Sequence, residues 1–315
     1  MADPRRPGVT AIHSLDRFVF SVPDLAVARA FYTDFGLDVR EVGGRLDLYT
    51  FGHPHRWGSI FQGGGAKKLE YLSLGVYDAD YEALRRHVEA AGAAIVDPHP
   101  LADTQGFWLT DPDGVHVQVV VAEKSSPNER FPSYGPKLVQ TARGIVVGPS
   151  RSGAEPVRPA RLTHALLFTS DVRRTADFYS NVLGLRLSDH SGEGIAFMHG
   201  AHGSDHHMLA FVKSHGPGLH HTSWVVRGID EVGLGMEQMC AKGHREGWGV
   251  GRHVIGSNYF YYVRDPWGSF AEYSYDIDFI GHDTDWPSAD HPPEDSFYLW
   301  GPAVPEYFAV NHEGR

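Results

Sequence analysis

The chain has 315 residues, of which 42% are hydrophobic and 12% aromatic, so it is long enough for about two domains with real cores. Its formal charge of −11, from 39 acidic and 28 basic residues, is opposite to the basic face that a nucleic-acid partner requires. No stretch approaches the roughly 20 apolar residues of a membrane helix, and no apolar signal segment follows the N-terminal arginines. We therefore expect a soluble, cytoplasmic protein that binds neither nucleic acid nor membrane and acts on a small molecule.

The predicted elements occur twice along the chain. Residues 17–39 (RFVFSVPDLAVARAFYTDFGLDV) and 164–187 (HALLFTSDVRRTADFYSNVLGLRL) share a strand-like run, an aspartate, a Phe-Tyr pair and Gly-Leu. Asp24 and Asp171 end the two strand-like runs and are suited to cap the helix that follows, whose apolar residues recur at helical spacing. Each copy therefore predicts a strand followed by an amphipathic helix.

The repeat continues downstream. Residues 69–92 correspond to residues 219–243, and both segments again predict a strand and then a helix. Residues 110–121 and 264–275 each place Asp-Pro-X-Gly between alternating apolar runs, which is typical of a β-hairpin. We therefore expect each half of the chain to consist of βα units completed by an antiparallel hairpin.

The regions outside the repeats set the expected domain boundaries. Residues 126–160 are rich in Pro, Ser, Gly and charge and predict a linker, in which GIVVG adds a short strand. We place the N-terminal domain at residues 1–125, the C-terminal domain at 161–285 and a tail at 286–315. The Pro-rich, aromatic tail would either cover the mouth of the second half or pack between subunits, with loose attachment as the default for a chain end.

Three residues of the second half are suited to hold a metal. His164 begins the first strand of this half, His221 lies in the strand LHHTSWVV, and Glu272 lies on the return strand of the final hairpin. Two neutral imidazoles and one carboxylate bind an ion such as Fe(II) on one face and leave other positions open for substrate and O₂. A structural metal site would instead be closed by four ligands.

The first half serves as an internal control for this set. In the register of the repeat, Arg17, Tyr71 and Gln118 stand where the second half has the two histidines and the glutamate. A structural role would predict similar residue types in both copies, and a single histidine in a strand is more often a core residue than a ligand. The loss of all three ligands together instead predicts one functional and one vestigial metal site.

This arrangement resembles the type I extradiol ring-cleavage dioxygenases of the vicinal oxygen chelate superfamily, over residues 10 to about 285. The resemblance implies an α+β fold in which each half contains two βαβββ modules that form an incompletely closed mixed β-barrel, and only the C-terminal half is active. It further implies Fe(II)-dependent cleavage of a catechol-type diol with incorporation of both atoms of O₂, by a homo-oligomer. Mn(II) is the alternative metal, because the same donors accept both ions.

The resemblance also assigns roles around the metal. His207, in HHMLAFV, corresponds to the family's acid–base histidine beside the O₂ site. His253 and Tyr262 precede Glu272 at the family's spacing and correspond to its substrate-contacting residues, with Tyr262 as the expected proton donor at ring opening. The remaining histidines of this segment are expected to be solvated or structural: His199, His202 and His206.

Two other functions within the superfamily remain as alternatives. A metal-dependent isomerase or lyase of the glyoxalase type would normally need a second glutamate at the position of His164 or His221, or a site shared between the halves. A ligand-binding protein without enzymatic activity would have no use for a complete set of metal ligands. Monocyclic, bicyclic and carboxylated catechols all present the same chelating pair, so the sequence leaves the substrate open.

Overall fold

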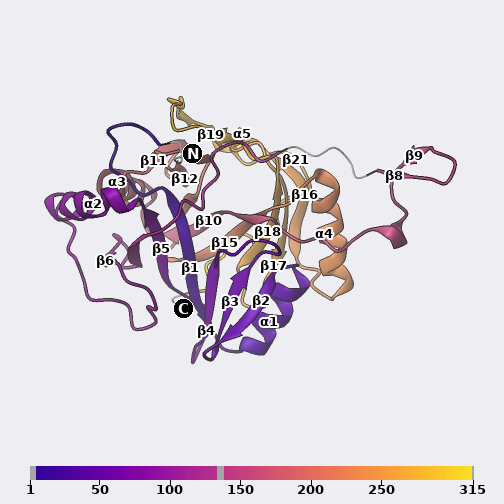
Figure 1. Ribbon diagram of the computed structural model, residues 1–315, viewed down its shortest axis with the longest axis horizontal. Coiled ribbons are helices and arrows are strands. Elements are labelled where there is room, and N and C mark those ends of the chain that lie inside the picture. The colour runs from indigo at the N-terminus through magenta and orange to yellow at the C-terminus, as the bar shows by residue number, and fades with distance from the viewer. Residues whose placement is uncertain (1–4, 133–137, 314–315) are drawn as a thin grey trace.

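The computed structural model describes residues 5–132 and 138–313, which form two large mixed sheets, one from each repeat (Figure 1). No helix in these residues is both long and apolar enough to cross a membrane. The elements of the first sheet and its helices are β1 (Ser14–Val22), α1 (Leu25–Asp34), β2 (Asp38–Val42), β3 (Arg45–Tyr49), β4 (Gly58–Gln62), β5 (Lys68–Val76), α2 (Asp78–Ala90), β6 (Phe107–Thr110) and β7 (His116–Val121).

The second half repeats this order with additional strands. Its main elements are β10 (Arg161–Thr169), α3 (Val172–Leu183), β11 (Arg186–Ser191), β12 (Ile195–His199), β14 (Leu209–Lys213), β15 (Gly218–Val225), α4 (Ile229–Ala241), β16 (Gly247–His253), β17 (Tyr259–Arg264) and β18 (Phe270–Tyr275). Its short elements are β13 (Ser204–Asp205), β19 (Phe279–Ile280), β20 (Ala289–Asp290), α5 (Pro293–Ser296) and β21 (Tyr298–Trp300).

The two sheets have the same topology. The first has the order β2-β3-β4-β1-β5-β7-β6, and the second contains β11-β12-β14-β10-β15-β18-β17, which is the same arrangement one repeat later. The second sheet is extended by β20 at one edge and by β16 and β21 at the other. Each sheet runs between two different edge strands and does not close on itself, so the expected fold of paired modules in incompletely closed barrels is confirmed.

Local sequence signals explain where the helices and hairpins begin. The side chain of Asp24 accepts hydrogen bonds from the first turn of α1, and Asp171 does the same for α3, as expected for N-caps. At the two hairpin turns, Gly114 and Gly268 have φ values of 85° and 96°, in the left-handed region that favours glycine. The second turn sets the register of β17 on β18, which pairs Tyr262 with Glu272.

The two halves share one apolar core cluster rather than two separate ones. The ring of Phe35, after α1, stacks on Tyr273 of β18 at 4.0 Å, and the Tyr273 hydroxyl donates to the Phe35 carbonyl at 2.7 Å. Nearby, Lys67 and Asp265 form an ion pair in which both side chains are buried. The first half therefore contributes directly to the packing of the second sheet.

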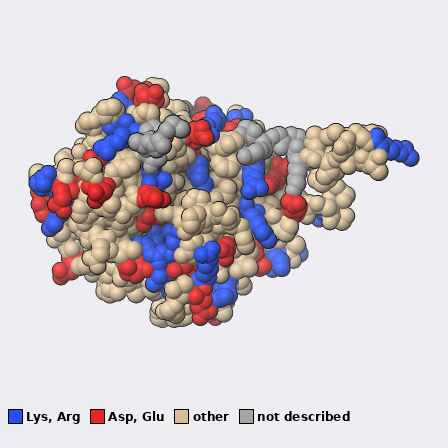
Figure 2. Space-filling model, viewed as in Figure 1, with Lys and Arg blue, Asp and Glu red and all other residues tan. Residues whose placement is uncertain are grey.

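The segment between the halves carries the short strand β9 (Val146–Val147), as expected from GIVVG, paired with β8 (Val139–Gln140). This hairpin projects from the body of the molecule (Figure 1). On the face shown in Figure 2, acidic and basic side chains are interspersed and no continuous basic band crosses the surface.

The C-terminal tail is held to the second sheet, so the default expectation of loose attachment is wrong. Strand β20 pairs with β11, β21 pairs with β16, and the Phe308 side chain is buried. The tail therefore forms part of the second half, while the domain boundaries at residues 125, 160 and 285 stay a prediction.

Candidate metal centre

Three adjacent strands of the second sheet bring His164, His221 and Glu272 together. His164 on β10 and Glu272 on β18 both pair with Ser223 of β15, so their side chains meet over one face of the sheet beside His221. One ligand atom from each residue lies within 4.8 Å of the others, and all three side chains are buried. Because the first and the last of them are 108 positions apart in the sequence, only strand pairing brings them together.

The hydrogen bond on the far side of His164 sets its tautomer. The Thr163 hydroxyl lies 3.0 Å from the carbonyl oxygen of Ser223 and donates to it. The same hydroxyl oxygen lies 3.1 Å from Nδ1 of His164, and because its hydrogen is already used, it accepts there. Nδ1 of His164 therefore carries the hydrogen, and Nε2 presents a lone pair.

His221 is oriented in the same way by its neighbour. Nε2 of His220 lies 2.8 Å from the carbonyl oxygen of Phe308, which can only accept, so this nitrogen carries a hydrogen. Burial lowers the pKa of His220 to about 4, so the ring is neutral and its Nδ1 accepts from Nδ1 of His221 at 2.7 Å. Nε2 of His221 is therefore also free of hydrogen, as a metal ligand must be.

Three lone pairs consequently converge at one point. The Nε2 atoms of His164 and His221 are 3.1 Å apart, and Oε2 of Glu272 lies 3.5 and 3.6 Å from them. Oε2 is buried and has no hydrogen-bond partner, whereas Oε1 accepts from the side-chain amide of Asn258 at 3.1 Å. A buried acceptor without a donor costs about 1 to 3 kcal/mol. A divalent cation would satisfy all three atoms, so these residues fit the expected metal.

The expected substrate-contacting residues lie beside Glu272. The carbonyl of Phe297 accepts from Nδ1 of His253 at 2.7 Å, so in the neutral ring Nε2 accepts from the Tyr262 hydroxyl at 2.9 Å. Burial, with Glu272 nearby, raises the pKa of Tyr262 well above its ordinary value, so the hydroxyl keeps its proton. The pair can therefore donate and accept hydrogen bonds next to the metal ligands.

His207 lies on another side of the same cavity. Its ring centroid is 4.0 Å from that of His164 and 4.9 Å from that of Phe197. Burial, followed by the nearby histidines with His164 foremost, lowers the pKa of His207 well below its ordinary value. His207, His253 and Tyr262 thus all line the cavity that contains the metal ligands.

Most of the remaining cavity wall is apolar. Among the described residues that line it there is no lysine or arginine, and Glu272 is the single carboxylate. The tail contributes part of this wall. The apolar wall residues are Leu166, Ile195, Phe197, Val212, Ile255, Phe297, Phe308 and Ala309.

Among the described residues, the corresponding region of the first half contains no set of metal ligands. Arg17 and Gln118 both pair with Ser73, just as His164 and Glu272 both pair with Ser223, so the register that was expected from the repeat is the one observed.

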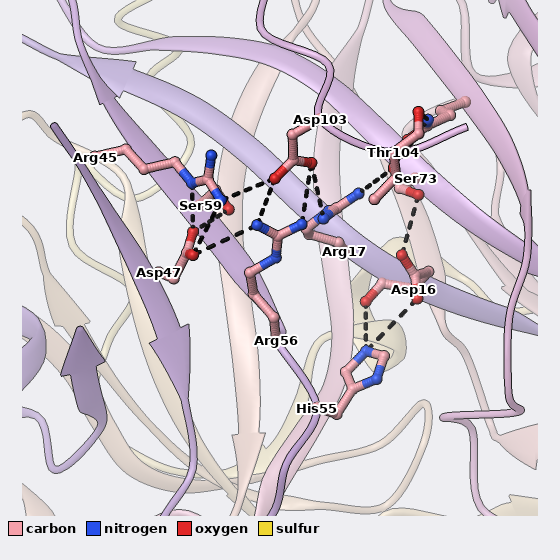
Figure 3. A network of polar contacts seen from close by, with 11 residues as sticks. Asp16, Arg17, Arg45, Asp47, His55, Arg56, Ser59, Ser73, Asp103 and Thr104 are labelled. Atoms are coloured by element: carbon pink, nitrogen blue, oxygen red, sulfur yellow. Dashed lines mark hydrogen bonds and ion pairs between the residues drawn. The ribbon is translucent and has the colours of Figure 1, made fainter. Parts of the chain in front are cut away.

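Charged side chains fill this region instead (Figure 3). Arg17 donates to Thr104 at 2.9 Å and to Asp103 at 3.3 Å, while Arg56 donates to Asp103 at 2.6 Å and to Asp47 at 3.4 Å. The carboxylates of Asp47 and Asp103 are therefore already bound by arginines. The first half therefore stabilises itself with ion pairs where the second half keeps free lone pairs.

Several residues that shape the centre carried no individual signal in the sequence. Thr163, His220 and Asn258 each depend on a partner on another strand or in the tail. The paired histidines His206-His207 and His220-His221 offered a sequence signal, because in each pair the first ring hydrogen-bonds the second. The three nearby histidines are buried rather than solvated: His199, His202 and His206.

Comparison with known proteins agrees with this geometry. The model of the Glyoxalase/Bleomycin resistance protein/Dioxygenase superfamily matches residues 14–119 and 161–273, the segments that form the two sheets. The chain belongs to this superfamily. Metapyrocatechase 2 of Cupriavidus necator is 47% identical over 303 residues, which cover 96% of this chain and 93% of that protein. The expected membership among the extradiol dioxygenases is thereby confirmed.

Solved structures share the fold at lower identity. The Mn(II)-bound glyoxalase from Novosphingobium aromaticivorans has a TM-score of 0.75 at 22% identity, covering 96% of each chain. Homoprotocatechuate 2,3-dioxygenase from Arthrobacter globiformis has a TM-score of 0.74 at 21% identity, covering 98% of this chain and 95% of that one. The same fold therefore occurs in a glyoxalase and in a dioxygenase, so the chemistry must be argued from the site.

Proposed function

We propose that the protein catalyses Fe(II)-dependent extradiol cleavage of a catechol-type diol with incorporation of both atoms of O₂, using His164, His221 and Glu272 as metal ligands. The observation that supports this most strongly is the unpartnered Oε2 of Glu272 facing two hydrogen-free imidazole nitrogens in a buried cavity. The identity of 47% to a metapyrocatechase points to the same chemistry. Iron, when bound, supplies chelation of the diol and activation of O₂.

The chain's own residues position the substrate and move protons. His253 and Tyr262 form a hydrogen-bonded pair beside Glu272, where they hydrogen-bond the diol oxygens, and Tyr262 is the proton donor at ring opening. His207 faces the cavity beside His164 and exchanges a proton with the reacting oxygens. The tight apolar wall holds the ring in reacting geometry and excludes water.

The lining of the cavity also favours one class of catechol. A carboxylated catechol would bring a negative charge into a buried site that offers no lysine or arginine among its described lining residues. Burying such a charge without a partner is costly. We therefore propose an uncharged diol, with a single ring or with an apolar substituent that lies against Phe297 and Phe308.

The test is turnover by protein purified without oxygen and loaded with Fe(II). O₂ uptake and near-visible absorbance are recorded with catechol, 2,3-dihydroxybiphenyl and a carboxylated catechol. We expect one O₂ consumed per diol and a yellow ring-fission product from the uncharged diols, with Glu272→Gln inactive. Parallel loading with Mn(II) separates the two candidate metals. Iron-loaded protein that leaves every catechol intact would contradict the proposal.

The isomerase alternative has its own observable outcome. A glyoxalase-type reaction needs a second carboxylate, and Glu272 is the single one among the described residues that line the cavity. We expect no turnover of the methylglyoxal–glutathione adduct. Isomerisation of this adduct without O₂ consumption would replace the dioxygenase proposal with the isomerase.

A further inference from the structure

His207 is hydrogen-bonded to a second histidine, His206, which in turn contacts the carboxylate of Asp189. Nδ1 of His206 lies 3.0 Å from Nδ1 of His207, and Nε2 of His206 lies 2.8 Å from Oδ2 of Asp189 on β11. The side chain of His206 is fully buried, and Asp189 is 8% exposed. The contacts connect His207, His206 and Asp189 in a chain that runs from the cavity to the tail. The proposed function assigns no role to His206 or Asp189.

The surroundings of Asp189 show which nitrogen of His206 carries a hydrogen. Besides His206, the carboxylate accepts from Trp286 Nε1 at 3.2 Å and from the backbone N–H of Ala289 at 2.8 Å, and His291 Nε2 lies 3.2 Å away. Burial acts to raise the pKa of Asp189, but these hydrogen bonds, with that of His206 foremost, hold it below its ordinary value. An ionised carboxylate can only accept, so Nε2 of His206 is the donor.

The tautomer of His206 determines that of His207. When His206 carries a single hydrogen, on Nε2, its Nδ1 is an acceptor, so Nδ1 of His207 donates to it across 3.0 Å. Nε2 of His207 then carries no hydrogen, and within residues 5–132 and 138–313 the hydrogen bond found for this ring is the one at Nδ1. This nitrogen is the one that remains to accept a proton from an occupant of the cavity.

The first half lacks a corresponding chain of an aspartate and two histidines. The strand registers place Arg40 where the active half has Asp189, and Arg56 where it has His207. His55 stands at the position of His206, but its Nε2 hydrogen-bonds the Asp16 carbonyl at 2.7 Å. Arginines thus replace both Asp189 and His207 in the half that also lacks the metal ligands, and the histidine that remains has a different partner.

We infer that Asp189 and His206 are positioning residues that lock His207 in one orientation and one tautomer, with Nε2 as the proton acceptor for a substrate hydroxyl. In that step the O–H bond of the diol breaks, its electron pair stays on oxygen, and an N–H bond forms at Nε2. Three tail residues complete this arrangement, because Trp286, Ala289 and His291 supply the other hydrogen-bond contacts to Asp189. The reaction served is the proposed function, on which this inference rests.

Asp189→Asn is the first variant, because its amide can donate to Nε2 of His206 and so reverse both tautomers. We expect kcat to fall about 100-fold, as for loss of a general acid–base group, with the KM for catechol and the metal content little changed. Asp290→Asn is the matched control, since this carboxylate is next to the tail contact but 60% exposed, and it should keep wild-type kcat. A kcat for Asp189→Asn within about threefold of wild type would overturn the inference.

A double variant separates positioning from general support of the fold. If Asp189 acts through His207, the variant that combines Asp189→Asn with His207→Phe should be no slower than His207→Phe alone. Rate losses that multiply would show that Asp189 stabilises something else and would overturn the inference.

A measurement without turnover distinguishes this inference from the proposed function. In long-range ¹H–¹⁵N spectra of ¹⁵N-histidine-labelled protein, we expect His207 to carry its hydrogen on Nδ1 in the wild type and on Nε2 in Asp189→Asn. A hydrogen on Nε2 in the wild type would overturn the inference even if catechol is cleaved. The expected spectra from a protein that leaves catechol intact would keep the positioning pair and reject the dioxygenase.

Discussion

The Nε2 atoms of His164 and His221 lie 3.1 Å apart, and neither carries a hydrogen, because the Nδ1 atom of each ring is committed as a donor on its outer side. The lone pairs of the two Nε2 atoms and the Oε2 atom of Glu272 therefore face one another in the buried metal centre. None of these three atoms has a hydrogen to donate. This contact is unfavourable in the metal-free protein and becomes favourable when a cation enters. Metal binding should accordingly stabilise the fold as well as enable the reaction.

Glu272→Gln should separate these two effects. The amide can donate to one Nε2 atom, so the metal-free variant should be about 1 to 3 kcal/mol more stable than metal-free wild type. Its metal affinity should nevertheless fall by at least about 100-fold, because the charged ligand is lost. Urea unfolding with and without Fe(II) or Mn(II), together with metal analysis, measures both quantities.

The control for that variant is Gln118→Ala, at the corresponding position of the first half. It should leave the bound metal per chain unchanged. Equal metal content in Glu272→Gln and wild type would remove Glu272 from the ligand set.

Phe297→Ala should widen the substrate range. Phe297 lines the cavity and is 37% exposed, so its truncation enlarges the cavity at little cost to folding. Its backbone carbonyl can still accept from His253. We expect the ratio of kcat/KM for 2,3-dihydroxybiphenyl to that for catechol to rise roughly tenfold. Leu299→Ala, at a tail residue that is 64% exposed, is the control and should leave the ratio unchanged. An unchanged ratio in both variants would place the substituent elsewhere.

Asp47→Ala should destabilise the protein without affecting the metal. The Asp47 side chain is 3% exposed and balances Arg45 and Arg56 in the vestigial site (Figure 3), so its removal leaves two confined guanidinium groups with less compensation. We expect a loss of about 3 kcal/mol in the free energy of unfolding. Asp38→Ala, which breaks a more exposed ion pair with Arg40, should cost less than about 1 kcal/mol. Similar losses in the two variants would show that the network contributes no more than a surface pair.

Mild acid should destabilise the metal-free protein through its buried neutral histidines. Burial lowers the pKa of His13 and His199 to about 3 and that of His220 to about 4, from an ordinary value of 6.5. Above pH 6.5 these histidines are neutral in both the folded and the unfolded protein. Below pH 6.5 they become protonated in the unfolded chain but stay neutral in the folded one. Stability should therefore fall with pH by about 1.4 kcal/mol per unit for each histidine, until the folded pKa is reached.

Asp111 acts in the opposite direction, because burial raises its pKa to about 6 and the folded state then holds the extra proton. The three histidines outweigh this one carboxyl, so the net slope keeps its sign. Urea unfolding between about pH 7.5 and about pH 5 measures the slope, and His199→Gln should make it shallower. A stability that stays constant over this range would contradict the prediction.

Much of the fold could be read from the repeated pattern of residues. Aspartate before a helical spacing of apolar residues, and Asp-Pro-X-Gly between alternating runs, depend on local backbone preferences, so Asp24, Asp171 and both hairpins were expected where they occur. The candidate metal ligands were visible because the two halves could be compared with each other. Where one copy has His164, His221 and Glu272 and the other has none of them, the residue types alone indicate the difference in chemistry.

The tertiary structure determined the contacts between residues that are far apart in the sequence. The Phe308 carbonyl reaches His220 from 88 residues away, Asp189 binds tail residues about 100 positions later, and arginines rather than a metal balance the carboxylates of the first half. Periodicity reports which face of a strand a side chain occupies, but not which distant backbone or side-chain atom arrives opposite it. Since a hydrogen bond requires both partners within about 3 Å, tautomers, cavity walls and the role of the tail emerged only once the strands were paired.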